Sequence, residues 1–184
     1  NPTFGSVTVV DRVKQQPVAQ LGGFSMPLDA LETEDGKFAV LDSSVGELSL
    51  ASQPDGAERR TIVHGLKTPI AMASDGVGGI FVTESGAGRV VRVDTATGEL
   101  SEVVNGLDAP QGIDIAPDGR LIVAEAGAGR VIAIDRDSGD FEVLADKLNI
   151  KPARGAGETP VLYAGLAVSA DGVVFVSSSR SNVI

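Results

Sequence analysis

The sequence predicts an all-β fold built from repeated units, and three observations point to it. Residues 82–100 and 123–141 match at nine of nineteen positions without a gap, 41 residues apart (123 − 82 = 41). Glycine supplies 23 of the 184 residues, whereas aromatic residues make up 4%. Short valine-rich runs alternate with Gly, Asp and Pro turns, which is typical of short strands. No capped helical stripe is seen.

The repeat unit contains four strand-like runs. In the copy that begins at Pro110 these are residues 112–116, 120–125, 130–135 and 141–145. Turn sequences rich in Gly and Asp separate them, as positive-φ turns require. The residues 121–123 are apolar throughout, as expected of a strand buried on both faces. A unit of about 40 residues with four antiparallel strands predicts a β-propeller blade.

The order of elements follows from the offsets between copies. We expect one propeller domain over 1–184: two outer strands (5–24), three whole blades (27–65, 69–106, 110–148), an insertion (149–162) and the inner strands of a further blade (163–184). The two end segments could join into one blade and close a four-bladed ring. We favour part of a larger, six-bladed ring, because four blades strain a sheet of ordinary twist.

Charge and composition exclude some classes of partner. The net charge of −10 disfavours nucleic acid and acidic membrane surfaces, which attract basic proteins. The absence of cysteine excludes disulfides, thiolate metal sites and a cysteine nucleophile. The compartment stays open, with an extracytoplasmic location favoured over the cytoplasm.

The stretch 109–135, "APQGIDIAPDGRLIVAEAGAGRVIAID", resembles an NHL-type repeat. It is also similar to the blades of streptogramin lyases and of the gluconolactonase and strictosidine-synthase-like superfamily. The resemblance covers nearly the whole chain apart from the insertion. It implies a β-propeller whose function is that of a metal-dependent lactonase or lyase, a synthase, or a non-catalytic interaction domain.

In the lactonase branch, the resemblance implies a divalent metal over the central channel. Ser25 stands where the family has a glutamate ligand, and Gln111 stands where it has an asparagine. The lyase branch uses a histidine, but His64, the only histidine here, matches no family motif and is expected at the surface. These departures weaken the case for the family's metal site.

A carboxylate recurs at the end of the second strand-like run in three consecutive blades, as Asp42, Glu84 and Glu125, with Ser178 at that position in the last unit. Converging on the channel, these three carboxylates would bind Ca²⁺ or Mg²⁺. Alternatively they hold up the blade by accepting hydrogen bonds from loop amides or a neighbouring blade, the interpretation we favour. The repeated Arg89 and Arg130 are expected to pair with Asp94, Asp135 or an adjacent blade.

Three residues break the repeat at the predicted channel mouth and are candidate ligand-binding residues. Asp29 replaces Ala71 and Gly112 of the other blades, Gln111 replaces an apolar residue, and Tyr163, the sole tyrosine, follows the insertion. Each residue also has a structural interpretation. Asp29 could be a turn residue that bonds local backbone, Gln111 could be simply exposed to solvent, and Tyr163 could pack its ring at the rim. The insertion, with Lys151 and Arg154, is a further candidate for shaping the site or contacting a partner.

Two functions remain open from the sequence. The first is a divalent-metal-assisted hydrolase or lyase acting on a small polar or lactone-type molecule at the channel mouth. The second is a non-catalytic propeller that binds a small-molecule or protein ligand on one face.

Overall fold

The computed structural model describes residues 5–52, 58–150 and 163–177, and every regular element in these ranges is a β-strand. In chain order the strands are β1 (Gly5–Asp11), β2 (Gln16–Phe24), β3 (Pro27–Glu32), β4 (Phe38–Asp42), β5 (Glu47–Ala51), β6 (Arg60–Val63), β7 (Pro69–Ser74), β8 (Gly79–Glu84), β9 (Arg89–Asp94), β10 (Leu100–Val104), β11 (Pro110–Ile115), β12 (Leu121–Glu125), β13 (Arg130–Ile134), β14 (Phe141–Ala145), β15 (Leu166–Val168) and β16 (Val174–Val176).

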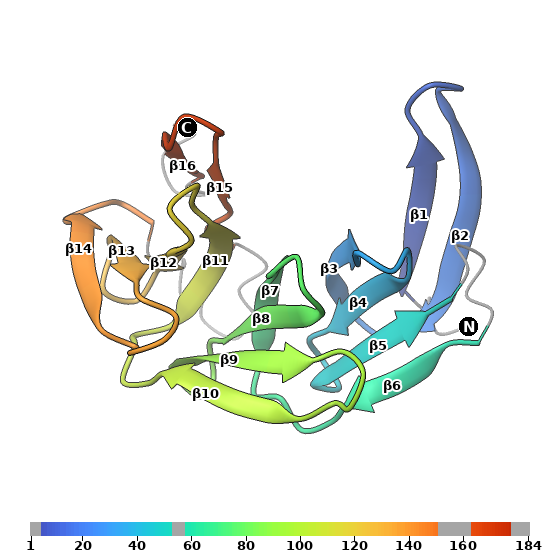
Figure 1. The fold of residues 1–184 in the computed structure, drawn as a ribbon, viewed down its shortest axis with the longest axis horizontal. Coiled ribbons are helices and arrows are strands. Elements are labelled where there is room, and N and C mark those ends of the chain that lie inside the picture. Colours follow the sequence, from blue (N-terminus) through green and yellow to red (C-terminus); the bar gives the residue numbers. More distant parts are fainter. Residues whose placement is uncertain (1–4, 53–57, 151–162, 178–184) are drawn as a thin grey trace, which may run out of the picture.

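The strands form three four-stranded antiparallel sheets and two hairpins. The first blade is β3–β6, the second β7–β10 and the third β11–β14, each with its strands in sequence order. An N-terminal hairpin, β1–β2, precedes them and a C-terminal hairpin, β15–β16, follows. Figure 1 shows the sheets side by side in an open arc, with the first strand of each blade on the concave side. The predicted all-β fold with four-stranded blades is confirmed.

Burial falls from the second strand of a blade to its last strand. All six residues of β8 and all five of β12 are buried, since blades cover both faces of these strands. By contrast, β14 has four exposed residues among five. The apolar run at 121–123 therefore has the cause inferred from the sequence, which is a strand enclosed between neighbouring sheets.

Apolar side chains hold neighbouring blades together. Leu41 and Leu48 of the first blade pack with Met72 and Ile80 of the second, in one buried cluster. A second cluster joins the second blade to the third. Since one four-stranded sheet cannot bury both of its own faces, each blade depends on its neighbours for burial.

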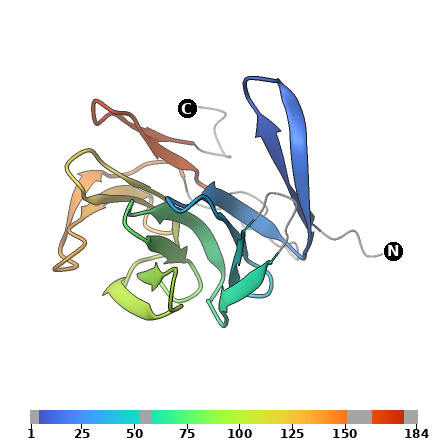
Figure 2. The same ribbon diagram turned by 45° about the vertical axis from the view of Figure 1, so that its right-hand side comes forward.

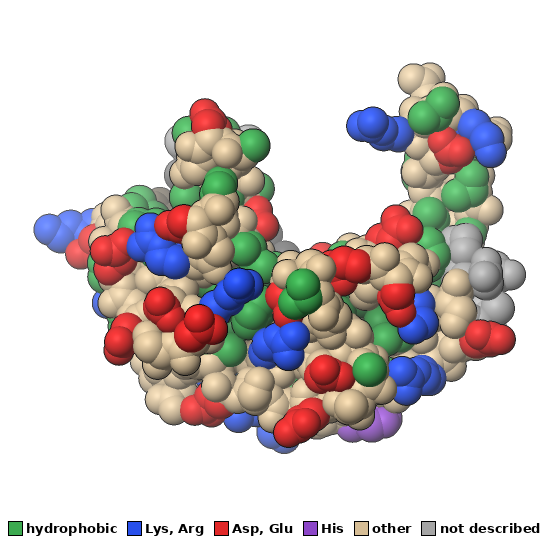
Figure 3. Space-filling view, viewed as in Figure 1, with side chains coloured by type: hydrophobic (Ala, Val, Ile, Leu, Met, Phe, Trp, Pro, Cys, Tyr) green, Lys and Arg blue, Asp and Glu red, His purple; other side chains and the backbone are tan. Residues whose placement is uncertain are grey.

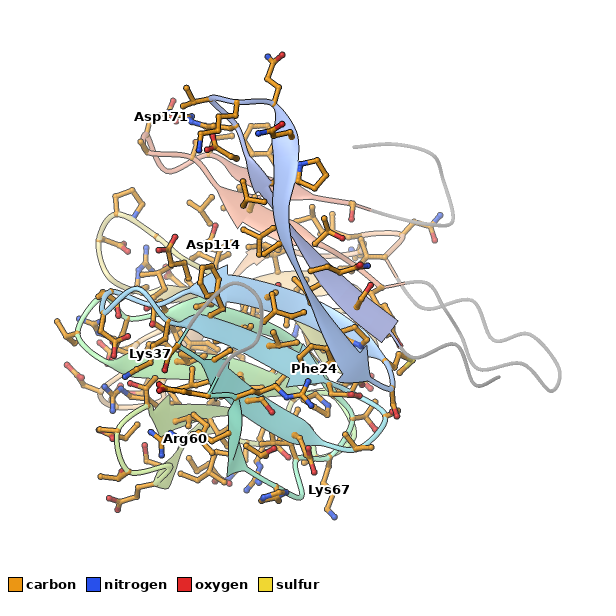
Figure 4. All side chains as sticks on the ribbon, turned by 90° about the vertical axis from the view of Figure 1, so that its right-hand side faces the viewer. Phe24, Lys37, Arg60, Lys67, Asp114 and Asp171 are labelled. Atoms are coloured by element: carbon orange, nitrogen blue, oxygen red, sulfur yellow. The ribbon has the colours of Figure 1, made fainter. Side chains whose placement is uncertain are left out.

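The two hairpins stand at opposite ends of the arc and are well separated in both ribbon views (Figures 1 and 2). Phe24, labelled in Figure 4 near the end of β2, packs on Val40 and Ala51 of the first blade. The guanidinium carbon of Arg59 lies 4.7 Å from the Phe24 ring centroid, and its Nη1 donates to the Gly22 carbonyl at 2.7 Å. These contacts attach the N-terminal hairpin to the first blade.

The turn after each second strand needs glycine. Gly88 has φ +65°, and a Cβ there would lie 2.5 Å from the Leu107 carbonyl oxygen. Gly129 has the same left-handed backbone, with φ +72°. A larger residue at Gly88 would therefore clash with the loop that connects this blade to the next one.

The surface of the arc is hollowed between the hairpins in the space-filling view (Figure 3), and acidic and basic side chains are interspersed over the sheets on this face. Among the described residues there is no helix with the length and apolarity that a membrane crossing requires.

Candidate functional site

The repeated carboxylates of the second and third blades are buried and hydrogen-bonded within their own blades. Glu84 is 0% exposed; its Oε1 accepts from the Lys67 amide at 2.6 Å and its Oε2 from Arg89 Nε at 2.6 Å. Glu125 repeats the arrangement with the Asp108 amide at 2.7 Å and Arg130 Nε at 2.6 Å. Each glutamate thus ties the loop before the first strand to the start of the third.

The partners of the repeated arginines correct the sequence-based expectation. Arg89 and Arg130 pair with Glu84 and Glu125, which lie directly opposite them in the sheets, and not with Asp94 or Asp135. The hydrogen bond that each arginine donates to its glutamate raises the pKa of that arginine. Asp94 and Asp135 instead accept amide hydrogen bonds within their own turns.

The first blade fills the same position without an arginine. Asp42 accepts from the Ser25 amide at 2.6 Å, the Met26 amide at 3.0 Å and the Ser44 hydroxyl at 3.2 Å. Glu47 lies opposite Asp42, where the other blades have arginine. Because Asp42 is one methylene shorter, its two oxygens take two loop amides in place of one amide and one guanidinium.

These carboxylates do not assemble into a shared ligand set. Over residues 5–52, 58–150 and 163–177, no three acidic or histidine side chains are grouped so that they could hold a metal ion. Asp42, Glu84 and Glu125 each direct their oxygens to donors of their own blade. The arrangement does not fit one cation shared among them. Ser178, which occupies this position in the last unit, lies outside the described residues.

A cavity of about 340 Å³ lies over the inner strands of four consecutive units. Its walls combine bulky apolar side chains with small residues: Leu28, Ile70, Ala71, Met72, Gly112, Ile113, Ala164, Gly165 and Leu166. Asp29 and Tyr163 also line it, and Asp29 is the only charged residue among these described lining residues. Two of the three predicted mouth residues therefore share one cavity.

Asp29 holds two blades together at the cavity wall. Its Oδ1 accepts from its neighbour's amide, Ala30, at 2.9 Å, and its Oδ2 accepts from the Met72 amide of the second blade at 2.8 Å. Burial raises the pKa of Asp29, although the two amide hydrogen bonds act in the opposite direction. The carboxylate is half-buried and keeps lone pairs for a ligand.

Asp114 makes the same inter-blade contact away from the cavity. Its Oδ1 accepts from the Ile115 amide at 2.8 Å and its Oδ2 from the Val168 amide of β15 at 2.7 Å. The inner strand of a blade pairs on only one edge, so amides on its other edge need acceptors from side chains. An aspartate on the neighbouring inner strand supplies one in both places.

Gln111 does not line the cavity. Its side chain is 4% exposed, so the alternative interpretation of Gln111 as a solvent-exposed residue is wrong. Its Oε1 accepts from the Ala164 amide at 2.6 Å, and its carbonyl oxygen accepts from the Thr83 hydroxyl at 2.6 Å. Both bonds connect neighbouring units. The predicted role of Gln111 in ligand binding stays a prediction.

Sequence reasoning missed Thr83 and Asp114. The available signal was a polar residue inside an apolar run: Thr83 ends "GIFVT" and Asp114 interrupts "GIDIA". His64 lies on the exterior, with Nδ1 3.1 Å from Glu47 Oε1. Of the insertion, residues 151–162, including Lys151 and Arg154, lie outside the described residues, whereas Ile150 is buried beside Ala126 and Ala164.

Comparison with known proteins identifies the fold class. A chain of the nidogen/laminin complex is 20% identical with a TM-score of 0.66, over 92% of this chain and 64% of that chain. Virginiamycin B lyase from Staphylococcus aureus is 14% identical with a TM-score of 0.65, over 97% of this chain and 64% of that chain. These neighbours are β-propellers, and so is this chain.

A catalytically inactive variant of the same lyase, with quinupristin, gives 17% identity and a TM-score of 0.62, over 97% of this chain and 55% of that chain. No family model matches the chain, and no curated protein matches it in sequence. The chain spans between 55% and 64% of the length of these structures. At such low identity the similarity establishes the β-propeller fold alone.

Proposed function

We propose that this chain is a ligand-binding β-propeller that takes a small molecule in the inner-strand cavity, with Asp29 as its charged contact. The cavity carries the proposal. Its volume of about 340 Å³ falls within the range of small-molecule sites, roughly 300–1,000 Å³. A concave site of this kind favours a small molecule over the protein ligand that the sequence also allowed.

The lining favours a ligand with a positively charged or hydrogen-bond-donating group on an apolar body. Leu28, Ile70 and Ile113 offer apolar walls, where burying an unpaired polar group would be costly. Asp29 can only accept hydrogen bonds when ionised, so it selects a donor. The Tyr163 ring could make a cation–π contact with a positively charged ligand.

Binding is better supported than catalysis. Asp29 and the Tyr163 phenol are the only titratable side chains among the described lining residues. Acid–base or nucleophilic chemistry usually needs a second group oriented toward the first. His64 is hydrogen-bonded to Glu47 elsewhere and does not line the cavity.

The test compares Asp29→Asn with Asp114→Asn. Both substitutions disturb the same kind of inter-blade carboxylate contact, but only Asp29 lines the cavity. A panel of cationic, neutral and anionic small molecules is scored by the rise in melting temperature, since binding to the native state raises it. We expect cationic compounds to stabilise the wild type and Asp114→Asn, and not Asp29→Asn. Equal shifts in both variants, or no shift with any compound, would reject the proposal.

A divalent-metal-assisted hydrolase or lyase is the second proposal. Its support is the presence of a lyase among proteins with this fold, and a carboxylate open to the cavity. With Asp42, Glu84 and Glu125 engaged within their blades, Asp29 is the one described carboxylate able to serve Ca²⁺ or Mg²⁺ in the cavity. Such a cation would polarise a ligand oxygen.

Thermal unfolding with EDTA, and with added Ca²⁺ or Mg²⁺, tests this second proposal. A bound cation raises the melting temperature by mass action. A rise that Asp29→Asn abolishes and Asp114→Asn retains would support it. The same melting temperature in EDTA and in millimolar cation would remove it, while leaving the small-molecule proposal intact.

A further inference from the structure

Two polar residues break the repeat behind the wall of the cavity. Thr83 stands where the other two blades have Leu41 and Ala124, and Gln111 stands where they have apolar residues. Both are buried, with Thr83 0% and Gln111 4% exposed. The two residues contact each other, since the Thr83 hydroxyl donates to the Gln111 carbonyl oxygen at 2.6 Å. Because burying a polar group is unfavourable unless it is paired, two such groups in adjoining blades indicate a local requirement.

The inner strands of these blades bulge at the same point. In the second blade, Ala71 and the residue before it lie opposite the single residue Thr83. In the third blade, Gln111 and Gly112 lie opposite Ala124. A bulge takes backbone groups out of the strand ladder, and bulges are common beside functional sites because they redirect side chains.

Thr83 and Gln111 supply the hydrogen bonds that the ladder lacks here. The Thr83 hydroxyl accepts from the Ala71 amide at 3.2 Å and donates to Gln111 of the next blade. The Gln111 Oε1 accepts from the Ala164 amide at 2.6 Å, and the Gly112 amide donates to the Ala164 carbonyl oxygen at 3.0 Å. A continuous set of hydrogen bonds therefore runs from the second blade to the last unit.

These hydrogen bonds connect the backbone segments that form the cavity. Ala71, Gly112 and Ala164 come from three consecutive units and all line the cavity, whereas Thr83 and Gln111 do not. Buried polar networks whose members are paired hold their surroundings in one arrangement. The network thus sets how the walls of the cavity stand relative to one another.

The backbone of the last unit comes very close to β11 where the network ends. A Cβ on Gly112 would lie 2.7 Å from the Leu166 amide nitrogen and 2.8 Å from the Ala164 carbonyl oxygen. Glycine permits this approach because it has no side chain. Tyr163 directly precedes Ala164 and lines the cavity beside it. The placement of the Tyr163 ring therefore depends on how the Ala164 backbone is held.

We propose that Thr83 and Gln111 are positioning residues for the cavity, an inference that rests on the small-molecule function proposed above. Neither residue touches the ligand. Gln111 holds the Ala164 amide and so keeps the Tyr163 ring in place for a bound cation. Thr83 holds the bulge from which Gln111 projects. The ligand then meets a wall that is already formed, which lowers the entropic cost of binding.

The fluorescence of Tyr163 tests the positioning without any ligand. Tyr163 is the sole tyrosine and the chain has no tryptophan, so emission excited in the tyrosine band reports this ring. Gln111→Met removes the acceptor from a side chain of similar length, and Thr83→Val removes only the hydroxyl. We expect quenching by acrylamide to rise in both variants, because the ring gains freedom when the Ala164 backbone is released.

Control variants separate positioning from a general loss of stability. Asp114→Asn disturbs the hydrogen bond to the Val168 amide, which joins the same two units, and Asp114 does not line the cavity. Thr83→Ser keeps the hydroxyl. Both controls should retain the quenching of the wild type well below the melting temperature. A merely structural role would lower the melting temperature of Gln111→Met and leave the quenching of Tyr163 unchanged.

Isothermal titration calorimetry with cyclohexylmethylamine tests the consequence for binding. This probe carries an ammonium group on an apolar ring, and cyclohexanecarboxylate is its anionic counterpart. We expect Gln111→Met and Thr83→Val to weaken binding of the amine by about tenfold, the cost of losing one buried hydrogen bond. Asp114→Asn and Thr83→Ser should keep the affinity of the wild type.

The outcomes distinguish this inference from the function on which it rests. If the wild type binds neither compound, the small-molecule proposal loses its support, while increased quenching confined to Gln111→Met and Thr83→Val still supports the positioning of Tyr163. Unchanged quenching in both variants, or an equal rise in Asp114→Asn, would overturn the inference. Increased quenching with an unchanged affinity for the amine would also overturn it. If Gln111→Met does not fold, Thr83→Val against Thr83→Ser gives the same comparison.

Discussion

The buried glutamates of the second strands and the half-buried Asp29 of the first inner strand differ in their access to solvent and to the cavity. Glu84 and Glu125, at the ends of second strands, are fully enclosed, and each is satisfied by one loop amide and one arginine of its own blade. Asp29, on an inner strand, takes an amide from the next blade and also lines the cavity. The first set stabilises the blade, whereas Asp29 retains access to a ligand.

The difference shows what a repeated residue means. The carboxylate at the end of the second strand occurs in all three blades and accepts at least one loop amide in each, whereas its arginine partner repeats only in the second and third blades. Asp29 stands where the other two blades have Ala71 and Gly112, so no carboxylate repeats at its position. A break in the repeat is therefore the better place to look for a ligand-binding residue, and the binding role of Asp29 stays a proposal.

Removing an enclosed glutamate should have the largest effect. Glu125→Ala leaves the Asp108 amide and Arg130 without their acceptor in a buried position. We expect a loss of about 3 kcal/mol in the free energy of unfolding. Urea denaturation at neutral pH measures it, with Glu142→Ala on the exposed strand β14 as the control. A loss below about 1 kcal/mol would contradict a structural role.

Removing the arginine should cost less than removing the glutamate. Arg130→Ala takes one donor from Glu125, but the arginine side chain is 29% exposed, so water can reach the space it leaves. The substitution also removes the contact between Arg130 and the Phe141 ring, at 5.4 Å. We expect a loss of about 2 kcal/mol by urea denaturation. A loss equal to that of Glu125→Ala would show that the pair acts as one unit.

The first blade allows the arrangement to be rebuilt. Asp42→Glu with Glu47→Arg places the residues of the other blades in cross-strand positions that face each other. A double-mutant cycle should give a favourable coupling of about 1 kcal/mol between the two substitutions. The single substitution Glu47→Arg should bring no gain, because Asp42 already accepts two amides and Glu47 loses its contact with His64. Additive effects would mean that the shorter aspartate position cannot accommodate the pair.

The fold was predictable because it repeats. The spacing of Pro69 and Pro110, the turn glycines and the apolar second strand all act at short range, and three consecutive copies carry the same information. Strand order then follows, since antiparallel neighbours joined by tight turns pair in sequence. The closure of the ring depends on long-range contacts that this repeat alone does not encode.

Two of the three candidate ligand-binding residues line one cavity, and their role in binding stays a prediction. Asp29 and Tyr163 line the cavity, whereas Gln111, near the start of β11, is buried and hydrogen-bonded to the next unit. The arginine partners were not predicted, because Asp94 and Glu84 lie equally close to Arg89 in sequence and only the cross-strand register separates them. Asp114 was missed because its acceptor role depends on the register of neighbouring blades.

The pH dependence of stability should give the smallest effect. Burial raises the pKa of Asp29 above its ordinary value of 3.8, so the folded state holds that proton more tightly than the unfolded state. Asp29 therefore makes the folded state less stable as pH rises from the ordinary pKa through the folded pKa. Asp29→Asn removes this slope. Subtracting the unfolding free energy of the wild type from that of the variant cancels the other carboxylates.

The unfolding free energy of Asp29→Asn minus that of the wild type should increase between about pH 3 and pH 7. We expect the increase to be less than about 1 kcal/mol. Asp75 provides a control of opposite sign. Burial alone would raise its pKa, but the Val77 and Gly79 amides and Arg92 lower it. The free energy of unfolding of Asp75→Asn should therefore fall relative to that of the wild type as pH rises. If the difference in unfolding free energy changed with pH for Asp75→Asn but not for Asp29→Asn, Asp29 would be as well solvated as a surface carboxylate. It would then differ from the enclosed glutamates only in its access to the cavity.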